Sequence, residues 1–199
     1  MKIAGTFRTD EWPALCARLK ADETAAWHEA ATLLRQRLGG RYLEHARELL
    51  NRRFSGFAIL AIDCAVIEAL EQFRKGTLST PRSMSGAYYR DFFTTTRFRK
   101  FFTANRADLF FDTVRCGILH QAESKADSLV KKSAASFVVR ESSSGAGLVI
   151  NAKRFHEELE GALDDYINAL LAGDVTLRKS FIKKMDYIAR SQTGSGAVV

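Results

Sequence analysis

The segment 57–73 constrains the fold more than any other part of this sequence. Its residues are apolar on almost every side of a helix, whereas a helix at the protein surface carries a single apolar stripe. Such a helix has to be surrounded by other elements, so we predict that it is the central and most buried helix. It also carries Asp63, Glu68 and Glu71, and buried carboxylates need partners.

Helical periodicity dominates the rest of the chain. Apolar residues recur at helical spacing after Asp10 and again from Thr24, which predicts two amphipathic helices. The pair Gly39-Gly40 is expected to break or kink the second of them before a helix resumes over 41–52. A further helix is predicted over about 105–120.

The C-terminal third combines a short β element with two more helices. Residues 137–140 and 148–150 have β-branched character, and the Ser- and Gly-rich stretch between them predicts a hairpin. Asn151 is a predicted N-cap for a helix that ends at Gly173, and Asp174 is expected to open a last helix. The fold class predicted is therefore all-α, a helical bundle with a small β-hairpin inserted before the C-terminal helices.

Composition sets the general class of the protein. With 199 residues, of which 46% are hydrophobic and only 2 are proline, the chain can bury a sizeable core. We expect one domain over residues 1–190, with its core at about 41–171, and a disordered tail over 191–199. No stretch approaches the roughly 20 apolar residues of a membrane span, and the first residues lack the apolar region of a secretion signal. We therefore predict a cytoplasmic protein with no membrane partner.

Charge and cysteine content restrict the classes of ligand that the protein is expected to bind. A formal net charge of +7 biases the surface towards polyanions such as RNA, although general solubility explains the charge equally well. The 3 cysteines, Cys16, Cys64 and Cys116, are far apart and odd in number. This pattern argues against a disulfide framework and against a zinc site, so we expect reduced thiols.

Arg115 and His120 form the most informative pair of residues for chemistry. They lie where an apolar, helical segment ends. An imidazole titrates near neutral pH and can pass a proton, while a guanidinium stays charged and holds phosphate oxygens. Together they suit phosphoryl chemistry on RNA, in which the His takes the 2′-hydroxyl proton or protonates the 5′-oxygen and the Arg stabilises the phosphorane. This chemistry requires no metal and no cofactor.

The spacing of the pair restricts how it can act. Five helical residues turn the chain by about 500°, so the two side chains point about 140° apart on a regular helix. They converge only if the helix ends or unwinds near residues 117–120, or if a two-fold dimer brings His120 of one protomer to Arg115 of the other. The alternative is structural: His120 caps the last carbonyls of its helix and Arg115 pairs with a surface acid.

A family resemblance supports the chemical interpretation. The segment 114–123, Val-Arg-Cys-Gly-Ile-Leu-His-Gln-Ala-Glu, preceded by the helix with 63–73, Asp-Cys-Ala-Val-Ile-Glu-Ala-Leu-Glu-Gln-Phe, resembles the HEPN superfamily of all-helical nucleotide-binding domains. The likeness covers roughly residues 41–171. Many members are metal-independent endoribonucleases, often toxins or phage-defence effectors, whose Arg and His act in a cleft at a dimer interface. The resemblance implies that Arg115 binds phosphate, that His120 transfers protons, and that the partners include RNA, a second protomer and an antitoxin protein.

One position departs from the pattern of that family. Catalytic members usually place Asn, Asp or His directly after the Arg, and Cys116 occupies that position here. A thiol is a weaker hydrogen-bonding group, and some members of the superfamily only bind nucleotides or partners. Two interpretations therefore stand: a dimeric ribonuclease that leaves a 2′,3′-cyclic phosphate, and a helical binding or dimerisation module without catalysis.

Glu68 is the supporting candidate on the central helix. It shares a helix face with Glu71, and we hypothesise that it reaches Arg115 or His120 and orients one of them, as a carboxylate orients a catalytic imidazole. The alternative is an ion pair between Glu68 and another arginine, such as Arg41 or Arg53.

RNA binding is predicted for the basic and aromatic stretch 88–102. Such mixtures can hold backbone phosphates and stack unpaired bases. The candidates are Arg90, Arg97, Arg99, Lys100 and Tyr88. Phenylalanines at this density usually pack in a core, so we expect only one or two rings to contact RNA. The pairs Arg52-Arg53 and Lys131-Lys132 are interpreted as solvated charges.

Overall fold

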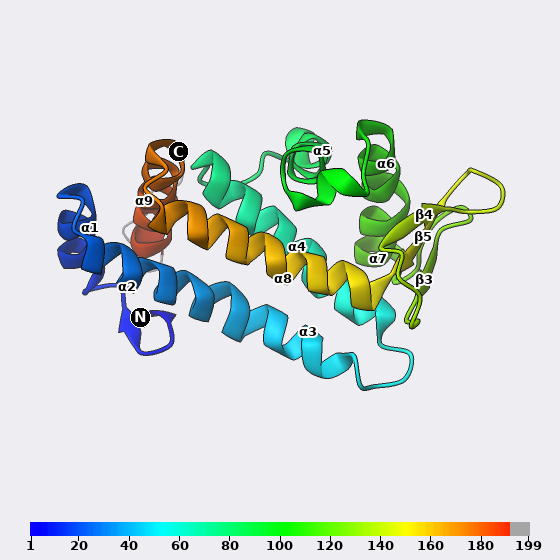
Figure 1. Ribbon diagram of the computed structural model, residues 1–199, viewed down its shortest axis with the longest axis horizontal. Helices are drawn as coiled ribbons and strands as arrows, with labels where there is room; N and C mark the ends of the chain where they lie inside the picture. Colours follow the sequence, from blue (N-terminus) through cyan, green and yellow to red (C-terminus); the bar gives the residue numbers. More distant parts are fainter. Residues whose placement is uncertain (192–199) are drawn as a thin grey trace. The chain divides into compact units, whose positions relative to one another are not determined.

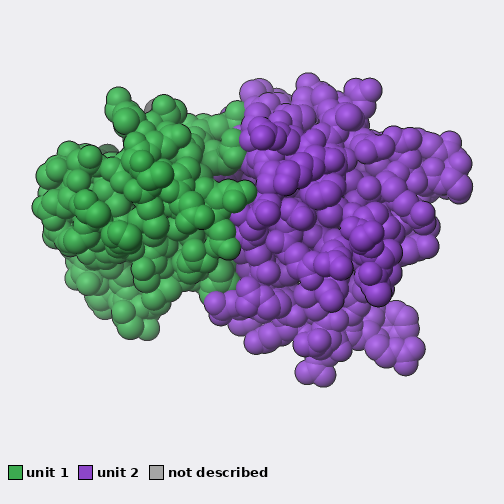
Figure 2. Space-filling model, viewed as in Figure 1, with its two compact units in different colours: residues 1–41, 72–80, 163–199 green, residues 42–71, 81–162 purple. Residues whose placement is uncertain are grey.

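The computed structural model describes residues 1–191, which divide into two compact units (Figure 2). Unit 1 comprises residues 1–41, 72–80 and the described part of 163–199, and unit 2 comprises 42–71 and 81–162. The two longest helices, α4 (Gly56–Lys75) and α8 (Ala152–Leu171), each begin in unit 2 and end in unit 1. The single domain over residues 1–190, with its core at 41–171, stays a prediction. Of the predicted tail, residues 192–199 lie outside the described part of the chain.

Unit 1 is organised around one phenylalanine ring. It contains β1 (Lys2–Ala4) paired with β2 (Phe7–Arg8), α1 (Trp12–Lys20), α2 (Thr24–Leu34) and α9 (Val175–Ser191) (Figure 1). The ring of Phe181 on α9 lies 6.5 Å from that of Trp12, 6.0 Å from that of Trp27 and 5.7 Å from that of Phe73. The predicted opening of the last helix is confirmed, because Leu177 N donates to Asp174 Oδ1 at 2.9 Å.

The helix predicted to break or kink at Gly39-Gly40 does not break, but the pair lies in a stretch that departs from the regular α-helix. After α2 the chain continues as the π-helical stretch η1 (Arg35–Leu43) and then as α3 (Glu44–Leu49). A helical glycine costs only about 1 kcal/mol, and the burial of Leu38 and Leu43, each 2% exposed, outweighs that cost. Side-chain packing therefore overrides the local preference of the glycine pair.

Unit 2 has an aromatic core. Its helical elements besides α3, α4 and α8 are η2 (Arg82–Met84), α5 (Ser85–Thr95), η3 (Arg97–Lys100), α6 (Ala104–Leu109), η4 (Phe110–Arg115) and α7 (Cys116–Gln121). Phe93 stacks on Phe102 with centroids 4.1 Å apart, and Phe110 stacks on Phe155 at 5.3 Å. Most rings of the stretch 88–102 are thus core residues, as their density indicated. On α4, Leu60, Ile67 and Leu70 are fully buried, as predicted for the central helix.

A three-stranded sheet follows α7. Its order is β3 (Leu129–Lys131), β5 (Leu148–Asn151), β4 (Val139–Glu141), with β5 in the centre. The β4–β5 hairpin confirms the prediction, whereas β3, which runs parallel to β5, was not expected. Asn151 ends β5 and directly precedes α8, as predicted for an N-cap, but its side chain does not cap the helix. Its Nδ2 donates to the carbonyls of Ser133 and Ala135, and its Oδ1 has no hydrogen-bond partner in the described residues. The fold is mostly helical with small sheets, which agrees with the predicted class in its coarse form.

None of the helices within residues 1–191 combines the length and the apolar character that crossing a membrane requires.

A fully buried ion pair joins α4 to α8 inside unit 2. Asp63 Oδ1 lies 2.8 Å from His156 Nδ1, and neither side chain is exposed to solvent. His156 Nε2 lies 3.3 Å from Glu160 Oε1, which in turn accepts from Arg47 Nε at 2.9 Å. The buried carboxylate of Asp63 on the central helix is therefore paired with His156. A chain of alternating charges continues from this pair to Arg47 on α3.

The buried pair makes the stability of unit 2 depend on pH. Burial raises the pKa of Asp63 from 3.8 to about 6. Burial lowers the pKa of His156, but its hydrogen bond to Asp63 and the charge of that carboxylate outweigh burial, so the pKa lies above 6.5. The pKa of each group is higher in the folded than in the unfolded protein. The stabilisation from each group is therefore complete below its unfolded pKa and is lost as the pH rises through its folded pKa. We expect the free energy of unfolding to fall by on the order of 2 kcal/mol between pH 4 and pH 8.

Urea unfolding at several pH values checks this expectation. The matched control is the double variant Asp63→Asn with His156→Gln, which keeps polar side chains of similar size but does not titrate. The difference between the two curves isolates the pair from the other carboxylates. A difference that is constant from pH 4 to pH 8 would contradict the expectation.

Candidate functional site

Arg115 lies at the junction of two kinds of helix. The π-helical turn η4 ends at Arg115, and the regular helix α7 begins at Cys116. A π-helical turn inserts one extra residue into a helix, and such turns are frequent at functional sites. The turn is fixed on its buried side by Thr113, whose hydroxyl lies 2.8 Å from that of Ser128. Arg115 is thus carried by an irregular but firmly held backbone.

Gly117 is needed for the chain to fold back after α7. The helix ends at Gln121, and the next residue, Ala122, has a left-handed backbone with φ of 55°. Lys125 N then donates to Thr113 O at 2.7 Å. A Cβ atom on Gly117 would lie 2.3 Å from the carbonyl oxygen of Glu123, so no larger residue fits under this crossing. The glycine in the Arg-Cys-Gly-Ile-Leu-His segment therefore allows a close crossing and does not unwind the helix.

Arg115 is held by Glu68, as hypothesised. Its Nη2 lies 3.3 Å from Glu68 Oε2, and its guanidinium lies 5.4 Å from the centroid of the Phe111 ring. The side chains of Arg115 and Glu68 are 17% and 25% exposed, so the pair is mostly but not completely withdrawn from water. Arg115 Nε is buried and has no hydrogen-bond partner within the described residues. The alternative pairing of Glu68 with Arg41 or Arg53 is not what the structure shows.

His120 lies exposed on the last turn of α7. The carbonyl end of this helix is capped by backbone groups, since Ala122 N donates to Ile118 O at 3.2 Å and Glu123 N donates to Gly117 O at 3.4 Å. Two of the last carbonyls of this helix are therefore capped by backbone groups and not by His120. Because α7 is regular from Cys116 to Gln121, His120 and Arg115 diverge by about 140° within one chain. The unwinding of the helix considered as one way for them to converge is therefore not observed, and convergence across a two-fold dimer stays a prediction.

The thiols next to this pair differ in accessibility. Cys64 is fully buried beside Glu68, and its carbonyl oxygen accepts from Tyr89 Oη at 2.8 Å. Burial raises the pKa of the Cys64 thiol to about 12, so it stays protonated and is a poor nucleophile. Cys116 is half-buried and remains a free thiol. Neither thiol shares the exposure of the His120 side chain.

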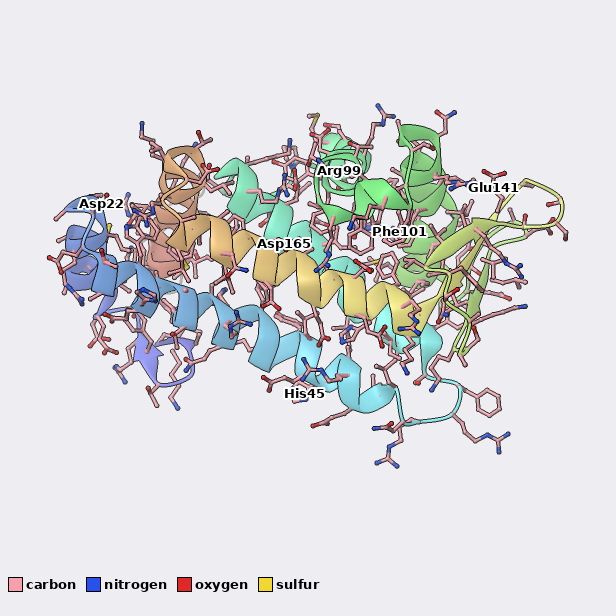
Figure 3. The ribbon with its side chains drawn as sticks, in the orientation of Figure 1. Asp22, His45, Arg99, Phe101, Glu141 and Asp165 are labelled. Atoms are coloured by element: carbon pink, nitrogen blue, oxygen red, sulfur yellow. The ribbon has the colours of Figure 1, made fainter. Side chains whose placement is uncertain are left out.

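The predicted RNA-binding residues differ in their availability. Arg90 makes two hydrogen bonds to Asp108, of 2.8 and 2.7 Å, and Arg97 Nε lies 3.0 Å from Glu158 Oε2. Arg99 and Lys100 are exposed on η3, where Figure 3 labels Arg99. Tyr88 is 5% exposed, because it lies on the buried face of α5. Its ring therefore cannot stack on a base in this conformation. Only Arg99 and Lys100 are both exposed and without an acidic partner in the described chain.

Two pairs of basic residues that are distant in the sequence lie in one region of unit 2. Lys132 donates to Leu50 O at 3.0 Å and to Ser55 Oγ at 2.9 Å, which ties the end of β3 to the turn between α3 and α4. Arg52, Arg53 and Lys131 thereby come to the same region of unit 2, and all three are exposed. The sequence contains both basic pairs, but that they lie in the same region follows only from the position of β3 in the fold.

Comparisons with known proteins give no match: no protein-family model, no curated protein and no solved structure matches this chain.

Proposed function

We propose that this protein is a metal-independent endoribonuclease of the HEPN type, which cleaves single-stranded RNA as a homodimer. The observation that carries the proposal is the pair formed by a fixed cation and an exposed imidazole on one helical segment. Arg115 is oriented by Glu68 at 3.3 Å, and His120 lies exposed five residues further on. Within this proposal the protein acts in the cytoplasm as a toxin or phage-defence effector, and an antitoxin protein restrains it.

The chemistry needs only groups that this chain supplies. His120 removes the proton of a ribose 2′-hydroxyl, the 2′-oxygen attacks the adjacent phosphorus, and the bond from phosphorus to the 5′-oxygen breaks. Water gives the leaving 5′-oxygen its proton and takes back the proton held by His120, so one Arg115 and one His120 suffice for each site. The products are a 2′,3′-cyclic phosphate and a free 5′-hydroxyl. Arg115 stabilises the charge on the phosphorane oxygens, and Glu68 is a positioning residue that holds the guanidinium.

A second candidate is a nucleotide-binding or dimerisation module without catalysis. The neutralisation of Arg115 by Glu68 favours it, because a paired guanidinium attracts phosphate less strongly than a free one. Cys116, in the position where catalytic HEPN members usually carry Asn, Asp or His, favours it as well. The two candidates share the binding of RNA phosphate and differ in proton transfer by His120.

Cleavage of a labelled single-stranded RNA in excess EDTA separates the two candidates. We expect the wild-type protein to cut it, and the variant His120→Ala to cut it about 10² to 10⁴ times more slowly, since this is the usual contribution of a positioned acid or base. An RNA methylated at its 2′-oxygens should not be cut, because it lacks the nucleophile.

The matched control is His28→Ala, which removes another exposed histidine from unit 1. Its cutting rate should equal that of the wild type. Both variants alter exposed side chains, so their stabilities should stay within about 0.5 kcal/mol of the wild type. Equal inactivity of folded wild type and His120→Ala across diverse RNAs would reject the ribonuclease and leave the binding module.

A further inference from the structure

The turn between α3 and α4 presents a phenylalanine to solvent in a strained conformation. Phe54 is 90% exposed, the highest value among the large apolar side chains of the described residues. Its φ of 57° lies in the left-handed region, which costs a bulky residue energy. A chain gains no packing energy from an aromatic ring held in this way. Residues with strained backbone conformations cluster at functional sites such as ligand clamps.

The turn is rigid, so the ring is held in place by its surroundings. Ser55 is 6% exposed, and its hydroxyl donates to Leu49 O at 2.6 Å and to Arg52 O at 2.9 Å. Lys132 reaches across from the end of β3 and donates to Leu50 O at 3.0 Å and also to Arg52 O. Because the backbone carbonyls of the turn are bound on both sides, little entropy is lost when a ligand meets the ring.

Basic residues lie at the turn of Phe54, and Glu48 is the acid that lines the adjoining hollow. The guanidinium carbon of Arg53 lies 5.3 Å from the centroid of the Phe54 ring. Within residues 1–191, Arg52, Arg53 and Lys131 form no ion pair, whereas Arg90 and Arg97 are bound to acids. The arginines of this turn are therefore more available for phosphate binding than Arg90 and Arg97, and as available as Arg99.

A hollow of about 580 Å³ opens beside the same turn. It is lined by His45, Glu48, Leu49, Asn51 and Arg52, and Figure 3 labels His45 on α3. These side chains supply hydrogen-bond donors and acceptors around one leucine. Such a lining suits a polar, planar group such as a nucleotide base better than an apolar peptide side chain or a lipid tail.

We propose that the turn 51–54 is an RNA-binding site apart from Arg115 and His120, in which a base of single-stranded RNA stacks on Phe54. Arg52, Arg53 and Lys131 hold the flanking phosphates, and a neighbouring base enters the hollow lined by His45 and Asn51. Cation and ring together form the usual platform for unpaired bases. The inference rests on the proposed function, because it assigns to the ribonuclease a place where it holds its substrate. It adds a site in the turn that joins α3 to α4.

Binding of a 2′-O-methylated single-stranded RNA tests the site without cleavage. The RNA should be long enough, about ten nucleotides, to cover one binding groove. We expect Phe54→Ala to weaken binding about 10-fold, which corresponds to the loss of one stacked base. Phe54→Trp should restore the affinity. Because the ring is exposed and alanine keeps the same backbone, Phe54→Ala should fold as the wild type does.

Two further variants define what the turn contributes. Tyr187→Ala, which removes an aromatic ring that is 37% exposed in unit 1, should bind like the wild type. The double variant Arg52→Ala with Arg53→Ala should reduce the slope of log affinity against log salt by about 1.4, or about 0.7 for each lost phosphate contact. Unchanged affinity and slope in the variants of the turn would overturn the site.

The outcomes separate this site from the proposed function. If the wild type cuts unmodified RNA and Phe54→Ala binds and cuts equally well, the site is wrong and the ribonuclease stands. If binding depends on Phe54 but no RNA is ever cut, the site stands and the catalytic proposal is wrong. Binding to anionic phospholipid vesicles that depends on Phe54, without binding to RNA, would overturn the site in favour of a membrane contact.

Discussion

Replacement of His156 by alanine is expected to lower the free energy of unfolding by about 3–5 kcal/mol. The reason is the uncompensated charge that the variant leaves behind. Asp63 has no exposed surface, its Oδ1 atom lies 2.8 Å from His156, and its Oδ2 atom has no other hydrogen-bond partner in the described chain. Without the imidazole the carboxylate must either ionise in an apolar core or take up a proton. Urea unfolding followed by circular dichroism measures the loss.

A double-mutant cycle shows whether the loss belongs to the pair. Asp63→Ala should cost a similar amount, and the double variant should cost less than the sum of the two, with an interaction free energy of about 0.5–3 kcal/mol. The matched control on the same helix is Arg154→Ala. It breaks the exposed pair with Glu157, whose atoms lie 2.9 Å apart, and it should cost less than about 1 kcal/mol. Losses of equal size for His156→Ala and Arg154→Ala would contradict the buried pair as a main support of unit 2.

The local patterns of the sequence predicted most of the helices and the β4–β5 hairpin. The apolar character of 57–73 indicated α4, and the density of phenylalanines indicated that their rings form a core. Local patterns predicted less well where packing opposed them. The Gly39-Gly40 pair stays helical because its neighbours Leu38 and Leu43 are buried. β3 carries no alternation of its own and exists because it pairs with β5.

The candidate site was predictable only in part, because its contacts are distant in the sequence. The chemistry of Arg115 and His120 can be inferred from residue types, and the acid on the facing helix was inferred as a hypothesis. That Glu68 rather than another acid meets Arg115 depends on the packing of elements 47 residues apart. The exposure and the strained backbone of Phe54 could not be inferred from local patterns, because Phe54 lies in a turn that the distant Lys132 helps to hold.

A heterodimer of two inactive protomers is expected to recover about half of the activity of the wild-type dimer. One protomer carries Arg115→Gln and the other carries His120→Ala. The homodimer of each variant should cut RNA at least about 10² times more slowly than the wild type. Because α7 is regular, Arg115 and His120 point away from each other within one chain. In the proposed site, the Arg therefore comes from one protomer and the His from the other. This heterodimer contains one such intact site out of two.

The reciprocal heterodimer makes the test decisive. It pairs a wild-type protomer with one that carries both substitutions. In the arrangement shared between protomers, each of its two sites lacks either the Arg or the His, so this dimer should be inactive. If each chain instead formed its own site, the order would reverse, with the first heterodimer inactive and the second retaining about half of the activity. Two different affinity tags isolate each heterodimer, and cleavage in excess EDTA reads out both. An active, strictly monomeric protein would contradict the shared site, because the geometry of α7 gives one chain no means of bringing the two side chains together.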